Sequence, residues 1–156
     1  MSTKLLALTA LAVAAAALTS AAAAGPSATR QRVAITAKKG DVHSFVLTAL
    51  TRGLVASDSG TMTDCCWTER VVVRNGQKIE SNDPLLTFTG KRGTFVYRAR
   101  IEWVDAGNGY GIGTGTWKIV RGTGAYKRLK GSGRTAGSWP SEGLVSWRAE
   151  GYFRLT

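Results

Sequence analysis

Residues 107–133 read GNGYGIGTGTWKIVRGTGAYKRLKGSG, and this stretch decides the fold. Glycine recurs in it with β-forming residues between, a pattern that predicts a strand, a tight turn, a short bend and a second strand. Such glycines serve close backbone approach or positive φ, and a small closed sheet needs both at its corners. The stretch therefore predicts an architecture and says little about chemistry.

Alternation of apolar and polar residues extends this prediction along the chain. It is clearest over residues 94–104, and Asn75-Gly76 is a strong signal for a type I′ hairpin turn. Residues 47–57 fit either a strand pair or a loop. About eight strands at this spacing predict an all-β chain folded as a single closed antiparallel β-barrel, with an open sandwich as the alternative. Strands are predicted over residues 33–37, 45–47, 67–74, 77–80, 85–89, 94–104 and 145–155.

The first 24 residues have the organisation of a signal peptide. Lys4 supplies a basic start, residues 5–18 form an uncharged apolar run, and residues 20–24 offer small residues for cleavage. A retained transmembrane anchor is the alternative, but alanine is weakly hydrophobic and no basic cluster follows. We expect residues 1–24 to be removed and residues 25–156 to form one β-barrel domain, exported to the periplasm or secreted.

The segment from Gly115 to Tyr126, followed by Leu129 and Gly131, carries a resemblance to a known group of barrels. It resembles the G-T-W/F…I/V-x-x-G-T-G-x-Y/F-x-x-L/A-x-G segment of allene-oxide-cyclase-like and dirigent-like β-barrels, and in particular their small exported bacterial members. Another small antiparallel barrel, such as a lipocalin-like one, is the competing interpretation. The resemblance implies a barrel fold and covers only residues 111–133 specifically.

Three functions follow from the resemblance and the composition. We expect a non-catalytic protein, without a cofactor, that binds a small apolar or aromatic molecule in the barrel. Plain core packing is the simpler interpretation of the same aromatic side chains. Many bacterial members of the families have no known activity, and trimeric members imply a homo-oligomer as one arrangement. The candidate ligand-binding residues are Phe95, Tyr97, Trp103, Trp117 and Trp147.

The alternative to simple binding is a cofactor-independent isomerase or cyclase, similar to allene oxide cyclase. Glu102 and Glu150 alternate with arginines in predicted strands and, with Tyr97, are the acid-base candidates. Two geometries are open. If the aromatic face is the core, the carboxylates form exposed ion pairs; if the polar face lines the interior, they belong to a charged lumen. Simple alternation places Tyr97 on the face opposite Glu102.

A third function follows from charge. The chain has 21 basic and 10 acidic residues, and its formal net charge of +11 becomes about +10 once Lys4 is removed. A charge of this size attracts polyanions, and for an exported protein these include anionic envelope polymers. No nucleic-acid-binding motif is present, so nucleic acid is not an expected partner; a solvated basic face is the simpler interpretation. The candidate polyanion-binding residues are Lys118, Arg121, Lys127, Arg128, Lys130 and Arg134.

Cys65 and Cys66 are the only cysteines, and they are neighbours. Free thiols, a vicinal disulfide and an intermolecular bridge are all open, because adjacent Cα atoms are closer than in most disulfides. His43 is the sole histidine, so neither a Ser-His-Asp triad nor a zinc site is indicated. We expect no metal.

Overall fold

The computed structural model describes residues 30–140 and 144–156. The predicted signal peptide and residues 25–29 lie outside the described residues. Across the described ranges, no helix combines the length and the apolar character that crossing a membrane would require.

Ten strands and one short 3₁₀ helix make up the described chain. All strand pairs are antiparallel. Most consecutive strands are neighbours, but β3 pairs with β6 because the β4–β5 hairpin stands between them in sequence and pairs with β7 instead. The elements are β1 (Arg30–Lys39), β2 (Ser44–Ala49), β3 (Asp58–Cys65), β4 (Glu69–Arg74), β5 (Gln77–Asn82), β6 (Leu85–Gly90), β7 (Gly93–Gly107), β8 (Tyr110–Gly122), η1 (Gly124–Tyr126), β9 (Leu129–Pro140) and β10 (Val145–Leu155).

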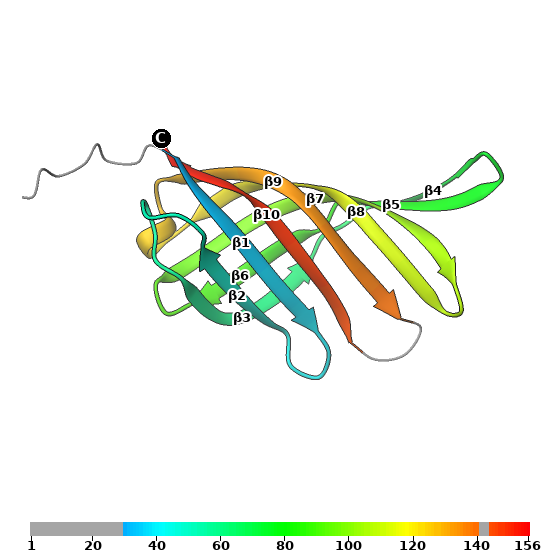
Figure 1. Cartoon of the computed structure of the whole chain (residues 1–156), viewed down its shortest axis with the longest axis horizontal. Helices are drawn as coiled ribbons and strands as arrows, with labels where there is room; N and C mark the ends of the chain where they lie inside the picture. Colours follow the sequence, from blue (N-terminus) through cyan, green and yellow to red (C-terminus); the bar gives the residue numbers. More distant parts are fainter. Residues whose placement is uncertain (1–29, 141–143) are drawn as a thin grey trace, which may run out of the picture.

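Eight of these strands close into a barrel. The sheet order runs β7-β6-β3-β2-β1-β10-β9-β8, and the pairing of β8 with β7 returns to the start. This confirms the prediction of an all-β fold with a closed antiparallel barrel and excludes the open sandwich. The hairpin of β4 and β5 continues the sheet from the second half of β7 and projects from one end of the barrel (Figure 1).

Most predicted strands are present, and the exceptions have physical reasons. Asn75 and Gly76 have φ values of 53° and 77°, as the predicted type I′ turn requires. Residues 50–57 form a loop rather than a strand pair. Strand β3 was not predicted, because its sequence DSGTMTDC is polar and Met62 is its only large apolar residue.

The interior of the barrel is apolar. The aromatic face of β7 points inward, and Phe95, Tyr97 and Ala99 are buried. The rings of Phe88 and Phe95 stack with centroids 4.8 Å apart, and Tyr126 lies 4.9 Å from Phe95. A charged lumen is therefore wrong, since these bulky rings occupy the inward face. Glu102 and Glu150, together with the arginines that alternate with them in sequence, Arg98, Arg100 and Arg148, lie on the outward face or near the surface.

One end of the barrel, which we call the plugged end, is closed by the loop of residues 50–57 and by η1. The buried Gln31 side chain donates from Nε2 to the carbonyls of Thr51 and Val55 and accepts from the Val55 N–H. These bonds hold the loop against the interior. Both Arg30 and the C-terminal residues leave the barrel at this end, side by side in the β1–β10 pair (Figure 1).

A second buried polar group closes the plugged end from the other side. The Tyr126 hydroxyl donates to Asp58 Oδ2 at 2.8 Å, and the same carboxylate accepts from the backbone N–H groups of Ser59, Lys91 and Arg92. Desolvation raises the pKa of Asp58, but these four hydrogen bonds outweigh it and hold the pKa below the ordinary value of 3.8. Asp58 thus ties η1, β3 and the β6–β7 turn together.

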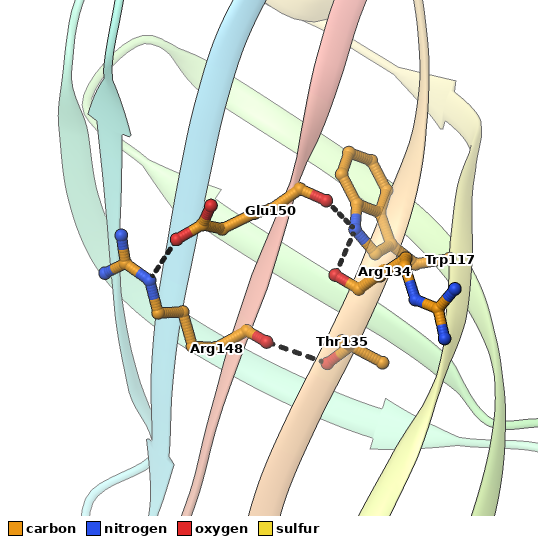
Figure 2. Close-up of polar contacts among 5 residues, drawn as sticks. All are labelled: Trp117, Arg134, Thr135, Arg148 and Glu150. Atoms are coloured by element: carbon orange, nitrogen blue, oxygen red, sulfur yellow. Dashed lines mark hydrogen bonds and ion pairs between the residues drawn. The ribbon is translucent and has the colours of Figure 1, made fainter.

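The largest interior side chain, Trp117, lies across two glycines. Its partners in the β8–β9–β10 register are Gly133 and then Gly151. A Cβ on Gly151 would approach the Trp117 ring to 2.8 Å. The indole N–H lies 3.2 Å from the Arg134 carbonyl and 3.3 Å from the Glu150 carbonyl (Figure 2). The absence of side chains on the two facing strands is therefore what admits this ring.

We predict that Asp58→Asn destabilises the fold by about 1.5–3 kcal/mol, because hydrogen bonds to a buried charge are lost. Since the folded pKa lies below the unfolded one, the carboxylate stabilises the fold above pH 3.8 and this contribution is lost as pH falls through the folded pKa. Urea unfolding from pH 7 to pH 2.5 should show the variant and the parent converging at low pH. Asp41→Asn in the exposed β1–β2 turn is the matched control, and an equal effect there would contradict the prediction.

Candidate functional site at the barrel mouth

The end opposite the plugged end is hollowed, and we call it the mouth. A cavity of about 300 Å³ opens there between the barrel and the β4–β5 hairpin. Four of the five tryptophans of the chain line it, and only Trp117 does not. The cavity lining consists of Lys39, Asp64, Trp67, Glu69, Glu80, Asn82, Pro84, Leu86, Ile101, Trp103, Gly113, Thr135, Gly137, Trp139, Val145 and Trp147.

Glycines in the register make this hollow. One row across the sheet runs from Trp103 on β7 through Gly113 and Gly137 to Trp147 on β10. The Trp103 indole lies on Gly113, where an added Cβ would be 2.6 Å from the ring. A Cβ on Gly137 would likewise lie 2.6 Å from Trp147 Cβ. Two large rings therefore stand at either side of a strip of bare backbone.

The floor of the cavity is formed by Trp147, which seals the mouth from the core. Its indole N–H donates to the Tyr97 hydroxyl at 2.9 Å. Burial raises the pKa of Tyr97, and the weaker opposing effect of the Trp147 hydrogen bond does not offset it. Tyr97 therefore stays a neutral hydroxyl below the cavity, and its ring stacks toward Trp117 with centroids 5.6 Å apart.

The outer wall combines two exposed tryptophans. Trp139 is 51% exposed and packs edge-on against Trp103 with ring centroids 6.0 Å apart. Trp67 is 50% exposed and precedes Thr68, whose N–H and hydroxyl both donate to Asp83 Oδ1. Those two hydrogen bonds, together with the ion pair to Arg98, lower the pKa of Asp83 to about 2. The carboxylate thus anchors the segment that carries Trp67.

Two buried polar atoms of the lining have no hydrogen-bond partner among the described residues. They are Nε1 of Trp103, a donor, and Oδ1 of Asn82, an acceptor. Buried polar groups in native proteins are nearly always paired with protein or water, and an unpaired one costs free energy. Both atoms are covered by neighbouring groups, so they lie behind the cavity surface rather than on it.

Cys65 and Cys66 form a vicinal disulfide at the end of β3, with Cα atoms 3.7 Å apart. Cys66 has a φ of 59°, so the chain turns sharply before Trp67. Of the three states that the sequence leaves open, the structure has the vicinal bridge. The bridge lies beside the cavity lining, between Asp64 and Trp67.

The structure does not bring the predicted acid-base residues together. Tyr97 is buried in the core, whereas Glu102 and Glu150 are exposed on the outer face. Glu102 lies 3.5 Å from Arg74, and the Glu150 carboxylate is turned toward Arg148 Nε at 2.6 Å (Figure 2). These are the exposed ion pairs of the simpler geometry, and neither carboxylate reaches the cavity or the interior.

The five predicted ligand-binding residues separate into two groups. Trp103 and Trp147 line the mouth, while Phe95, Tyr97 and Trp117 are packed into the core. Sequence reasoning missed Trp67 and Trp139, because each stands at the edge of a strand and outside the best alternation. Their signal is residue type alone, since exposed tryptophans are uncommon.

The predicted polyanion-binding residues are all exposed, and they come from two neighbouring strands and from the segment after η1. Lys118, Lys130 and Arg134 lie on β8 and β9, Arg121 lies near the end of β8, and Lys127 and Arg128 follow η1. The register adds Arg154 and Arg30, which sequence reasoning missed because they come from opposite ends of the chain. Lys130 faces Arg154, and Arg154 faces Arg30, a set of three that we call the basic row.

No protein-family model, curated protein or solved structure matches this chain. Membership of the allene-oxide-cyclase-like and dirigent-like barrels therefore stays a prediction.

We predict that Gly113→Ala displaces the Trp103 indole, because the new methyl group would lie 2.6 Å from the ring. The cost should be about 1–3 kcal/mol in the free energy of unfolding, as in other overpacked sites. The near-ultraviolet circular dichroism of the Trp103–Trp139 pair should change as well.

Gly111→Ala, two residues earlier on β8, is the matched control. Its Cβ would approach no atom closer than 3.6 Å, so it should leave the spectrum unchanged. Identical spectra for the parent and Gly113→Ala would contradict the arrangement described.

Proposed function

We propose that this protein binds a small apolar or aromatic molecule, without catalysis, at the mouth of the barrel. The observation that carries the proposal is the cavity of about 300 Å³ walled by four tryptophans. That volume is at the lower end of the range of about 300–1,000 Å³ typical of small-molecule sites. The site lies above Trp147 rather than in the barrel interior, which packed rings fill.

The predicted acid-base residues Glu102 and Glu150 lie outside the cavity lining, which supports binding over the catalysis that they were expected to perform. An isomerase or cyclase of the expected kind needs an acid-base pair within hydrogen-bond reach of one substrate. Glu102 and Glu150 instead face solvent with arginine partners. Trp67 and Trp139 are half exposed beside the cavity. Exposed apolar surface of this kind marks binding sites, and an aromatic ligand would cover both rings.

We predict that 2-naphthylmethanol, a neutral bicyclic probe, binds at the mouth. In protein labelled with ¹⁵N-tryptophan, it should shift the indole N–H signals of Trp67, Trp103, Trp139 and Trp147, because their side chains line the cavity. The Trp117 signal should stay in place, since that N–H is held by two backbone carbonyls in the core.

Trp139→Ala should weaken binding of this probe at least tenfold, equivalent to about 1.4 kcal/mol, by removing one aromatic wall. Because Trp139 is half exposed, stability should change little. Tyr152→Ala, an exposed aromatic on the outer face of β10, is the matched control and should bind like the parent. Absence of any shift at millimolar probe would refute the proposed function.

A second candidate function is binding of an anionic polymer of the cell envelope through the basic row. Lys130, Arg154 and Arg30 stand directly opposite one another on adjacent strands, where like charges destabilise a sheet. Arg30 also stacks on the Tyr152 ring at 3.6 Å, and no acidic side chain interrupts the row. A polyanion would relieve this repulsion.

We predict that replacing the basic row by glutamine lowers the salt concentration at which the protein elutes from heparin. The control replaces Arg70, Arg74 and Lys78 of the hairpin, which removes the same charge at the other end of the molecule. A larger loss for the basic row supports a site, because long-range attraction by net charge alone affects both triple variants equally. If both triple variants elute at equally lowered salt concentrations, heparin binding depends on net charge alone and the basic row is not a site.

A further inference from the structure

The mouth differs in charge from the rest of the molecule. Three of the ten acidic residues of the chain, Asp64, Glu69 and Glu80, line the cavity, against a single basic residue, Lys39. Lys39 and Asp64 neutralise each other, with Nζ 2.7 Å from Oδ2, which leaves Glu69 and Glu80 as the excess charge of the lining. In a chain of net charge +11, the cavity is thus a locally acidic site.

The register concentrates this acidity beside the tryptophans. Glu80 on β5 lies opposite Trp103 on β7, and Glu69 on β4 lies opposite Asn82 on β5. Glu80 and Asn82 are two residues apart on one strand and so share a face. One wall of the cavity therefore carries two carboxylates beside an indole.

The partners of these acidic groups leave them available to a ligand. Glu69 forms no ion pair with any described residue. Glu80 lies 3.0 Å from Lys78, but the Lys78 side chain is 64% exposed and outside the cavity lining, so this contact is a solvated one of small worth.

We infer that the ligand of the mouth is an organic cation, an ammonium group carried on an apolar or aromatic body. This inference rests on the proposed function and adds the charge of the ligand. Tryptophan faces attract cations through the ring quadrupole, and the attraction strengthens where water is excluded. Glu69 and Glu80 supply acceptors for the ammonium N–H groups, while the apolar body covers Trp139 and Trp147.

The two levels of electrostatics make opposite predictions, which gives the inference a sharp test. The long-range field of a +11 chain favours anionic ligands. The local field of the mouth favours cations. A preference for a cation can therefore arise only from the groups around the cavity.

The experiment compares three probes with one bicyclic body at pH 7: 2-naphthylmethylammonium, 2-naphthylmethanol and 2-naphthoate. Binding is followed by calorimetry and by the indole N–H signals of ¹⁵N-tryptophan. We expect the cation to bind at least tenfold more tightly than the carboxylate, with the alcohol between them.

Glu69→Gln and Glu80→Gln should each reduce the affinity for the ammonium probe about threefold to tenfold and leave that for the alcohol unchanged within twofold. Glu150→Gln, the same change on the outer face, is the matched control and should leave all three affinities unchanged. If either variant also weakens binding of the alcohol by more than twofold, that glutamate has a structural role and does not recognise the charge.

The outcomes separate the inference from the proposed function. If the alcohol binds as tightly as the ammonium probe, or the carboxylate binds best, the cation inference is overturned and aromatic binding stands. If none of the three probes shifts the four mouth signals, both are overturned. If the preference for the cation is unchanged in both Glu69→Gln and Glu80→Gln, the inference that these glutamates bind the ammonium group is overturned as well.

Discussion

The contact on which the rest of the structure depends is that of an indole ring with a glycine on the facing strand. Trp117 occupies the space above Gly133 and Gly151, and Trp103 lies on Gly113. An eight-stranded barrel has an interior only wide enough for side chains to fill, so rings of this size need bare backbone opposite them. At Trp117 the ring itself fills the space above Gly133 and Gly151, and the interior is solid. At the mouth, Gly113 and Gly137 lie between Trp103 and Trp147, and a cavity remains.

The two ends of the barrel are closed by different kinds of side chain. At the plugged end, Gln31 and Asp58 recruit backbone groups from the 50–57 loop and from the turns, so every buried polar atom of these side chains has a partner. At the mouth, tryptophans take the place of such a loop, and the indole of Trp103 and the amide of Asn82 stay unpaired among the described residues. The plugged end is thus closed by paired polar groups, whereas the mouth is lined by aromatic rings around a cavity.

Much of the fold could be predicted from sequence because the alternation in β7 and β10 is strong, and because Asn75-Gly76 between two β-forming segments indicates a type I′ hairpin turn. The direction of each strand face could not, since both faces of β7 carry bulky residues and only barrel closure decides which is inside. Strand β3 lacks apolar alternation and was not predicted.

Of the candidate site, Trp103 and Trp147 were predicted as ligand-binding residues. Trp67, Glu69 and Asn82 join the site only because the β4–β5 hairpin docks on β7, and this docking leaves no local signal in the sequence. The basic row is likewise a product of pairing between the two ends of the chain.

The pairing of β1 with β10 also fixes how the barrel can be attached to anything else. Arg30 lies opposite Arg154, so the described chain enters and leaves at the plugged end, and the mouth lies at the far end of the same strands. A fluorescent domain, a surface tether or a solid support attached before Arg30 or after Arg154 would hold the barrel by its plugged end, with the cavity directed outward. The same geometry allows the two ends to be linked by a short peptide and the chain to be reopened elsewhere, for instance in the β1–β2 turn, without disturbing the closed sheet.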